Sequence, residues 1–191
     1  MRIEKLQRSY DIAVRYQFFP LHPETPAEGV SLEVLFGGRD DKEARKARQV
    51  RMKGLMVAEG LPYGERTHSY NSRLAQELGK WAETQSGGSA IHDAIYKAYF
   101  VEGRNIGDPE VLVDVARSVG LAPEEARKVL VERSFRNAID QDWVTSRQVG
   151  VSGVPTFAAG GQGVVGAQPY ELLEQLVLAA GAKPRREGAA T

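Results

Sequence analysis

Strand-forming residues lie near the two ends of this chain, and a long helix-forming stretch separates them. Residues 12–19 are rich in β-branched and aromatic side chains and stop at a proline, which predicts a strand. Residues 154–157 and 164–165 flank the turn sequence Gly-Gly-Gln-Gly and predict a hairpin. The order of helix, strand, helical block, hairpin and helix predicts an α/β fold that carries a large helical insertion.

Apolar residues recur at helical spacing through most of the remaining chain. Residues 20–38 contain three prolines and three glycines, and we expect an irregular connection there. Asp40 or Asp41 is expected to cap the helix that follows. The expected helices cover residues 2–10, 40–58, 72–84, 89–101, 109–119, a segment from 123 onward, 135–148, and a last segment from 169 onward.

The chain contains no cysteine, and this excludes several kinds of chemistry for its 191 residues. Disulfide bonds, thiolate catalysis, cysteine-ligated zinc and iron–sulfur clusters all need the missing thiol. The three histidines, His22, His68 and His92, are far apart in the sequence and do not have the i, i+4 spacing of a helical metal pair. We therefore expect no metal and no cofactor.

The charge balance and the lack of a long apolar run argue against a nucleic acid or a membrane as a partner. Lys plus Arg equals Asp plus Glu at 25 each, whereas a nucleic-acid binder normally carries a basic excess. No apolar run approaches the roughly 20 residues of a membrane span. The first ten residues also lack the apolar segment of a signal peptide. These features predict a soluble, cytoplasmic protein.

Two motifs of other enzyme classes are present only in part. Residues 161–166 satisfy G-x-G-x-x-G, but the central Val-Val favours a strand and the next helix begins only near Pro169. Residues 150–154 come close to the G-x-S-x-G nucleophile motif, but the second glycine comes one place early and a helix, not a strand, precedes Ser152. The hairpin explains the first pattern better, and the second predicts no hydrolase.

Several loose motifs occur together in a familiar order. The motifs are residues 18–23 (Phe-Phe-Pro-Leu-His-Pro), 71–75 (Asn-Ser-Arg-Leu-Ala), 98–106, 150–157 (Gly-Val-Ser-Gly-Val-Pro-Thr-Phe) and 166–169 (Gly-Ala-Gln-Pro). The combination resembles the DsbA-like family of thiol–disulfide oxidoreductases, closest to its FrnE-type branch of cytoplasmic bacterial oxidoreductases, from about residue 3 to residue 178. Related members that share the fold are the 2-hydroxychromene-2-carboxylate isomerases and the kappa-class glutathione transferases.

The resemblance implies a thioredoxin-like (DsbA-like) fold with a large helical insertion. Residues 1–38 and 149–191 would form a discontinuous thioredoxin-like domain, and residues 39–148 the insertion and connecting helix. The bond before Pro155 would be cis, and the backbone of Val154, Pro155 and Thr156 would bind an extended substrate. The implied partners are protein or peptide substrates that carry thiols or disulfides.

The same resemblance shows what these residues lack. In the family, a first core strand leads into Cys-Pro-x-Cys at the start of the first helix, and residues 2–10 match only the later part of that helix. We therefore expect no catalytic residue here, no activity in the chain as given, and unpaired backbone groups beside a slot in the core. A misplaced translation start or a chain cut after the motif explains this better than a natural pseudoenzyme.

Two alternatives stay open at this point. One is a redox-dead module that binds a peptide or another partner through the groove beside the cis-proline. The other is a truncated glutathione-dependent isomerase or transferase, whose catalytic serine would also stand at the missing helix start. The sequence does not fix the substrate or the oligomeric state, and a homo-oligomer is one of the forms it allows.

Overall fold

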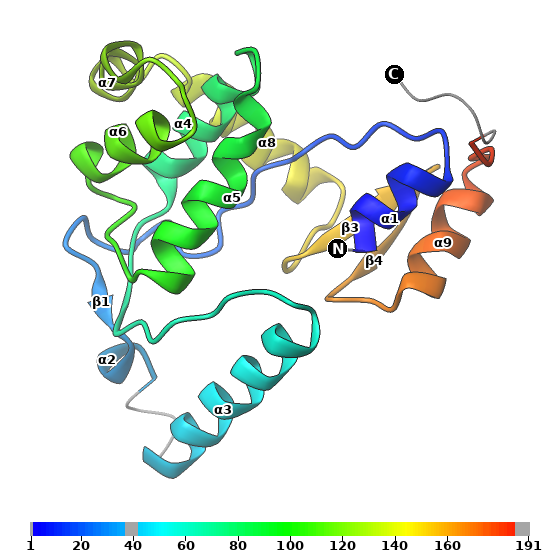
Figure 1. The fold of residues 1–191 in the computed structure, drawn as a ribbon, viewed down its shortest axis with the longest axis horizontal. Coiled ribbons are helices and arrows are strands. Elements are labelled where there is room, and N and C mark those ends of the chain that lie inside the picture. The colour runs from blue at the N-terminus through cyan, green and yellow to red at the C-terminus, as the bar shows by residue number, and fades with distance from the viewer. Residues whose placement is uncertain (1, 37–41, 186–191) are drawn as a thin grey trace. The chain divides into compact units, whose positions relative to one another are not determined.

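The computed structural model describes residues 2–36 and 42–185, which form two compact units (Figure 1). One unit consists of Met1–Leu21 and Asp142–Thr191, and the other consists of His22–Gln141. The assignment of residues 1–38 and 149–191 to one thioredoxin-like domain stays a prediction. Asp40 and Asp41, the expected caps, lie outside the described residues.

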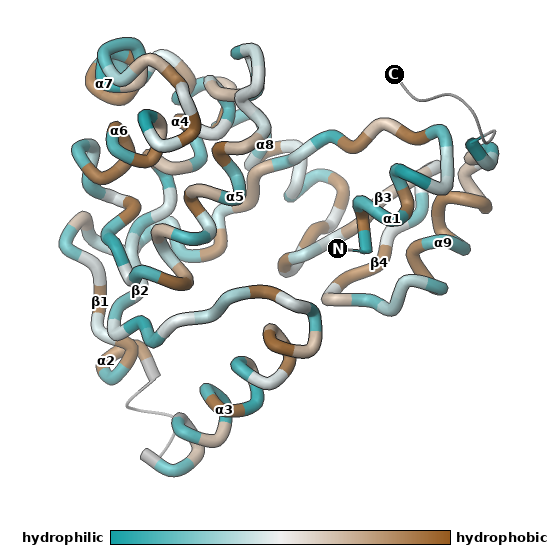
Figure 2. The backbone as a smooth tube through the Cα atoms, viewed as in Figure 1, coloured by the Kyte–Doolittle hydropathy of each residue, from teal (hydrophilic) through white to brown (hydrophobic). Residues whose placement is uncertain are grey.

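The unit His22–Gln141 is built around four short helices with one hydrophobic core: α4 (Arg73–Ala82), α5 (Ile91–Tyr96), α6 (Pro109–Ser118) and α7 (Pro123–Glu132). Leu78, Ile91 and Leu112 are fully buried within it, and the apolar stretches of these helices can be followed in Figure 2. Asp108 caps α6 by accepting a hydrogen bond from the Glu110 backbone N–H at 2.8 Å. Pro109 stands at the first helical position, where its missing N–H leaves no donor unsatisfied. The helix therefore begins where the sequence predicts.

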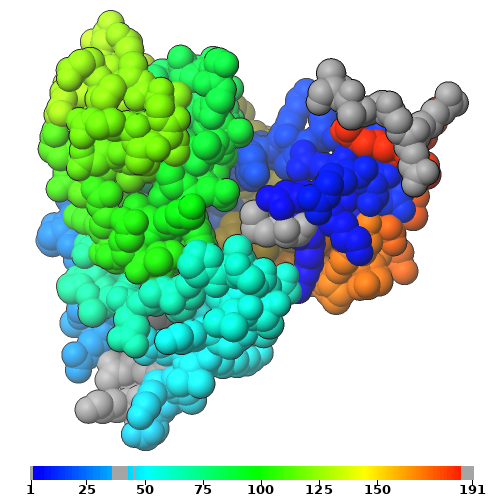
Figure 3. All heavy atoms as spheres, viewed as in Figure 1, coloured from blue at the N-terminus to red at the C-terminus, as the bar shows by residue number. Residues whose placement is uncertain are grey.

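Smaller elements complete this unit. A 3₁₀ turn over Gly88–Ala90 and a π-helical turn over Lys97–Val101 flank α5, so the continuous helix expected over residues 89–101 is divided into three parts. The expected irregular connection contains β1 (Val30–Ser31), which pairs with β2 (His68–Ser69), and α2 (Leu32–Phe36). The helix α3 (Lys42–Ala58), whose atoms are cyan in Figure 3, has exposed apolar residues, with Val50 64% and Leu55 53% exposed.

One carboxylate is buried in this unit together with two arginines. The Glu77 side chain is fully buried on α4, and its oxygens accept hydrogen bonds from Arg73 at 2.7 Å and from Arg133 at 2.7 and 2.8 Å. Arg133 ends α7 in the left-handed conformation, with φ of 55°. Burial raises the pKa of Glu77, but the hydrogen bonds from Arg133 and Arg73 outweigh it, so the net shift is downward.

The other unit contains α1 (Arg2–Ser9), the end of α8 (Arg136–Gln148), the hairpin of β3 (Thr156–Ala159) and β4 (Gln162–Val165), and α9 (Tyr170–Ala179). Helix α9 packs against both α1 and β3. The hairpin turns at Gly160 and Gly161, whose φ angles of 56° and 78° glycine adopts without strain.

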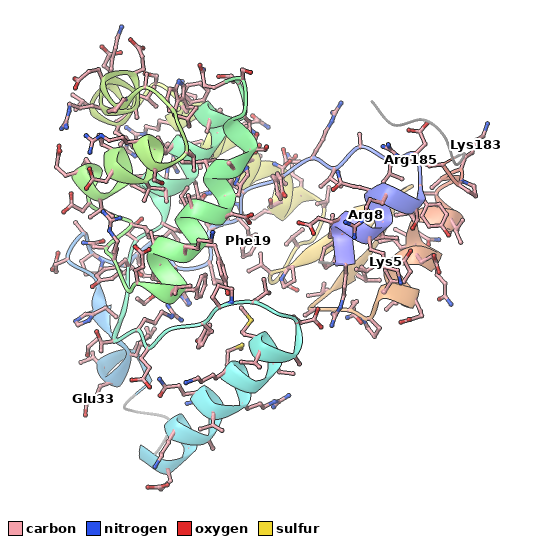
Figure 4. The ribbon with its side chains drawn as sticks, in the orientation of Figure 1. Lys5, Arg8, Phe19, Glu33, Lys183 and Arg185 are labelled. Carbon is pink, nitrogen blue, oxygen red and sulfur yellow. The ribbon has the colours of Figure 1, made fainter. Side chains whose placement is uncertain are left out.

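The hydrophobic core of this unit is thin. Among its described residues, the buried apolar side chains are those of Leu6, Leu173 and Leu176. Helix α1 buries Leu6 while its charged residues Lys5 and Arg8 are exposed, and Figure 4 shows both labelled. The amphipathic first helix predicted from the sequence is therefore confirmed.

The strand predicted over residues 12–19 is wrong. Residues 11–20 have no regular secondary structure, and the sheet of this unit has two strands, β3 and β4. The end of the segment is held by side chains of α8: Asp142 accepts a hydrogen bond from the Phe18 N–H at 3.4 Å, and Ser146 donates one to the Phe18 carbonyl at 3.2 Å. A strand needs a neighbour for its backbone groups, and no described segment pairs with this one.

Candidate peptide-binding edge

The segment that leads into β3 is shaped by the end of α8. The chain leaves the helix at Gly150, whose φ is 76° and whose N–H donates to the Arg147 carbonyl at 3.0 Å. The Val151 N–H donates to the Ser146 carbonyl at 2.9 Å, and the two bonds together form a helix-terminating motif. This ending sends the chain directly into the predicted site residues.

The peptide bond between Val154 and Pro155 is cis, the isomer that the sequence analysis expects. The Pro155 carbonyl accepts a hydrogen bond from the Gly166 N–H at 2.7 Å, which joins this residue to the hairpin. The Thr156 hydroxyl donates to the Gly153 carbonyl at 2.6 Å and so ties the strand to the preceding turn. The three predicted binding residues thus form one continuous, well-anchored segment.

Val154 has an open backbone. In the described residues its N–H and carbonyl make no hydrogen bond, and the residue is 48% exposed. An exposed backbone with both a free donor and a free acceptor can pair with an extended peptide. Val154 offers this pairing, whereas the Pro155 carbonyl is already used.

The free edge continues along β3. The bond from Gly166 to the Pro155 carbonyl and the antiparallel register place Phe157 opposite Val164 as a hydrogen-bonded pair. Because hydrogen-bonded and non-hydrogen-bonded pairs alternate, Thr156 and Ala158 direct their N–H and carbonyl groups away from β4. Ala158 therefore belongs to the free edge, although no sequence pattern singled it out.

A cavity of about 420 Å³ lies beside this edge. Most of its lining residues have apolar side chains, but polar atoms also face it, and its charged residues are Asp11 and Arg15. The lining residues come from α1, residues 11–15, β3 and α9 with the turn after it: Ile3, Leu6, Asp11, Ile12, Ala13, Val14, Arg15, Thr156, Phe157, Ala158, Ala159, Leu173, Leu176, Val177, Ala180, Gly181 and Ala182.

The histidines considered as metal ligands do not come together. Their surroundings are unrelated: His22 lies 3.7 Å from Glu24, His68 stacks on Tyr70, and His92 lies 3.4 Å from Glu83. Within the described part of the chain, no group of three or more histidine or acidic residues could hold a metal ion. No helix in the described ranges is long and apolar enough to cross a membrane.

Comparison with known proteins gives this geometry a context. The family model described as DSBA-like thioredoxin domain matches residues 1–178. The structure is similar to the crystal structure of a probable DsbA oxidoreductase from Streptomyces coelicolor, with 27% identity and a TM-score of 0.86 over 100% of this chain and 83% of the other. It also resembles a 2-hydroxychromene-2-carboxylate isomerase, with 20% identity and a TM-score of 0.68 over 94% of this chain and 85% of that one, a likeness of fold.

A curated relative, the uncharacterized protein YwbO of Bacillus subtilis, is 27% identical over 111 residues, which are 58% of this chain. The match spans 55% of that protein's length. The family match extends over most of the chain, and the structural likeness includes the segment around the cis bond. The chain belongs to the DSBA-like thioredoxin domain family and has its thioredoxin-like fold with a helical insertion.

Proposed function

We propose that these residues supply the peptide-binding part of a DsbA-like thiol–disulfide oxidoreductase of the FrnE-type branch, acting on protein or peptide substrates in the cytoplasm. The open backbone of Val154 beside the cis bond carries the proposal. An extended substrate would add to this edge as a short strand, with main-chain hydrogen bonds that do not depend on its sequence. Such pairing suits an enzyme that acts on many different proteins.

The redox step itself lies outside the chemistry of these 191 residues. Thiol–disulfide exchange begins with attack by a thiolate and passes through a mixed disulfide. The chain has no cysteine to form one. We therefore propose that the chain alone binds peptides without reducing or oxidising them.

The proposal is tested by nuclear magnetic resonance with a synthetic peptide. A peptide that contains one disulfide and a second in which serine replaces both cysteines are each titrated into the ¹⁵N-labelled chain. We expect both peptides to shift the Val154 amide and to slow its exchange with solvent, because the pairing uses the backbone. Insulin reduction should stay at the uncatalysed rate throughout.

A matched pair of substitutions separates backbone pairing from side-chain contact. Val154→Ala keeps the N–H and should retain binding, whereas Thr156→Val removes the bond to the Gly153 carbonyl and should weaken binding by loosening the segment. Binding that leaves the Val154 amide unchanged would refute the proposed site. A response of the Val154 amide to glutathione instead of the peptides would favour the isomerase or transferase alternative.

A further inference from the structure

We propose that helix α3 is a docking face for an acidic amphipathic helix of another protein, which packs on it as in a two-stranded coiled coil. The face lies in the unit His22–Gln141 and does not involve Val154, so it is independent of the proposed substrate contact. The charge of α3, the spacing of its exposed residues and the open space beside them all favour this partner.

Helix α3 concentrates positive charge in a chain whose net charge is zero. Six of its 17 residues are basic, and one, Glu43, is acidic. Some of the cations stand three or four positions apart, such as Arg48 and Arg51, and like charges at this spacing repel each other along a helix. Gly54 in the interior lowers the intrinsic stability of the helix further. An anionic partner would relieve the repulsion and stabilise the helix.

Apolar residues of α3 are left uncovered in the described part of the chain. Val50 is 64% exposed and Val57 is 65% exposed. No other described helix or strand packs extensively on α3, and Figure 2 shows hydrophilic and hydrophobic residues interleaved along it. Because most of the stability of a helix in a protein comes from packing of its apolar side chains, a partner that covers these valines would stabilise α3.

The exposed residues of α3 have the spacing of a coiled-coil seam. Ala47, Val50, Gly54 and Val57 are separated by three, four and three positions and therefore lie on one face of the helix. All four are exposed, whereas Met56 on the other side of the helix is half-buried. The face that carries the seam is therefore the one that a partner can reach.

Small residues let a partner approach this face closely. A Cβ atom added at Gly54 would meet no other described atom within 4 Å, so space is open beside the helix there. Ala47 and Gly54 alternate along the seam with Val50 and Val57. Large apolar side chains of a second helix can therefore pack on the two small residues, between the valines.

Basic residues line both sides of the seam. Lys46 and Lys53 flank it on one side and Arg51 on the other, and all three are exposed. In coiled coils the residues at these flanking positions select the partner by charge, so glutamates on the second helix are favoured. A second copy of α3 would bring like charges together and is disfavoured.

The same face is less suited to a membrane or a nucleic acid. A helix that binds at a membrane surface buries a broad apolar face with large residues, and this seam offers two valines, an alanine and a glycine. The phosphates of a nucleic acid would pair with the cations but would leave the exposed valines uncovered. An acidic helix with large apolar residues matches both the charge and the seam.

The test uses the full 191-residue chain and a synthetic peptide of about 21 residues, or three heptads, with leucine at the seam positions and glutamate at the flanking positions. Repulsion between the glutamates opposes pairing of the peptide with itself. One control peptide has lysine in place of each glutamate, and a second is polyglutamate of the same length. A short DNA duplex and vesicles of phosphatidylcholine with phosphatidylglycerol complete the set. Calorimetry gives the affinities, and nuclear magnetic resonance gives amide exchange.

We expect the acidic peptide to bind and to slow amide exchange at Val50, Gly54 and Val57, with an affinity that falls as salt is added. The lysine peptide and polyglutamate should each bind at least about tenfold more weakly, because each lacks one of the two matched features.

A charge-reversed chain serves as the matched variant. With Lys46→Glu, Arg51→Glu and Lys53→Glu together, the preference between the acidic peptide and the lysine peptide should be reversed. The three residues are exposed, and a gain of binding to the lysine peptide cannot arise from misfolding.

Four results would overturn the proposal. The first is an acidic peptide that does not bind, or that binds without a response in α3. The second is equal binding of polyglutamate and the acidic peptide, which would show that the seam plays no part. The third is tighter binding of the DNA or the vesicles, which would identify another class of partner. The fourth is self-association through α3 before any peptide is added, which would identify a second copy of the chain as the occupant.

Discussion

Replacing Glu77 with glutamine should destabilise the unit His22–Gln141 strongly, although the side chain keeps its shape. The carboxylate is fully buried and accepts three hydrogen bonds of 2.7–2.8 Å from Arg73 and Arg133. Glutamine removes the negative charge and turns one acceptor into a donor that faces an arginine. The two cations then stay close together without a counter-charge between them.

The size of the effect follows from the exposure of the partners. Removing one member of a buried ion pair costs about 3–5 kcal/mol. The Arg133 side chain is 40% exposed and can recover hydration, and Arg73 keeps its contact of 2.8 Å with Asp140. We therefore expect a loss at or below the lower end of that range, about 2–3 kcal/mol in the free energy of unfolding.

Urea denaturation followed by tryptophan fluorescence measures this loss. Trp81 lies in the affected unit and is 7% exposed, and a Trp143→Phe background makes it the single reporter. Glu110→Gln is the matched control, because Glu110 pairs with Arg127 in the same unit but its side chain is 66% exposed. The control should lose far less stability, because an exposed ion pair is screened by water. Equal losses in the two variants would refute the argument from burial.

Three further predictions follow from the structure. The arginine bonds lower the pKa of Glu77 below its ordinary value of 4.5. The contribution of Glu77 to stability should therefore be complete above about pH 4.5 and decrease as the pH falls through the lowered pKa. Urea unfolding curves should show a smaller difference in the free energy of unfolding between wild type and Glu77→Gln at pH 3 than at pH 7. Asp108→Ala should cost about 1 kcal/mol in urea denaturation, since it removes the cap of α6, and Asp108→Asn should recover most of it. Leu176→Ala should lower the free energy of unfolding by about 2 kcal/mol or slightly more, at the low end for core leucines, because a cavity already lies beside this side chain. A loss above about 4 kcal/mol in thermal denaturation would contradict the open cavity.

Most helices of this protein could be predicted from the sequence, because helix signals are local. Asp108 and Pro109 mark the start of α6 by their own hydrogen-bonding capacity, and the structure places the cap there. The turn at Gly160 and Gly161 was equally predictable, since glycine adopts positive φ without strain. The hairpin and the last helix follow from the same local rules.

The site was predictable only in part. The run around Pro155 pointed to the proposed binding segment, and the family match places this run in a DSBA-like thioredoxin domain. The participation of Ala158 depended on strand register, which decides the direction of each backbone group and leaves no trace in composition. The assignment of residues 1–38 and 149–191 to one thioredoxin-like domain stays a prediction.

The amino-acid sequence by itself determined the helices, the turn and the absence of a thiol, because each depends on residues that are neighbours in the chain or on simple composition. The tertiary structure, and not the local sequence, decided that residues 12–19 do not form a strand. Their β-branched and aromatic side chains favour an extended backbone, but a strand exists only where a second strand accepts its hydrogen bonds. No described segment does so, and the segment lies instead along a cavity with its backbone unpaired between Ala13 and Arg15.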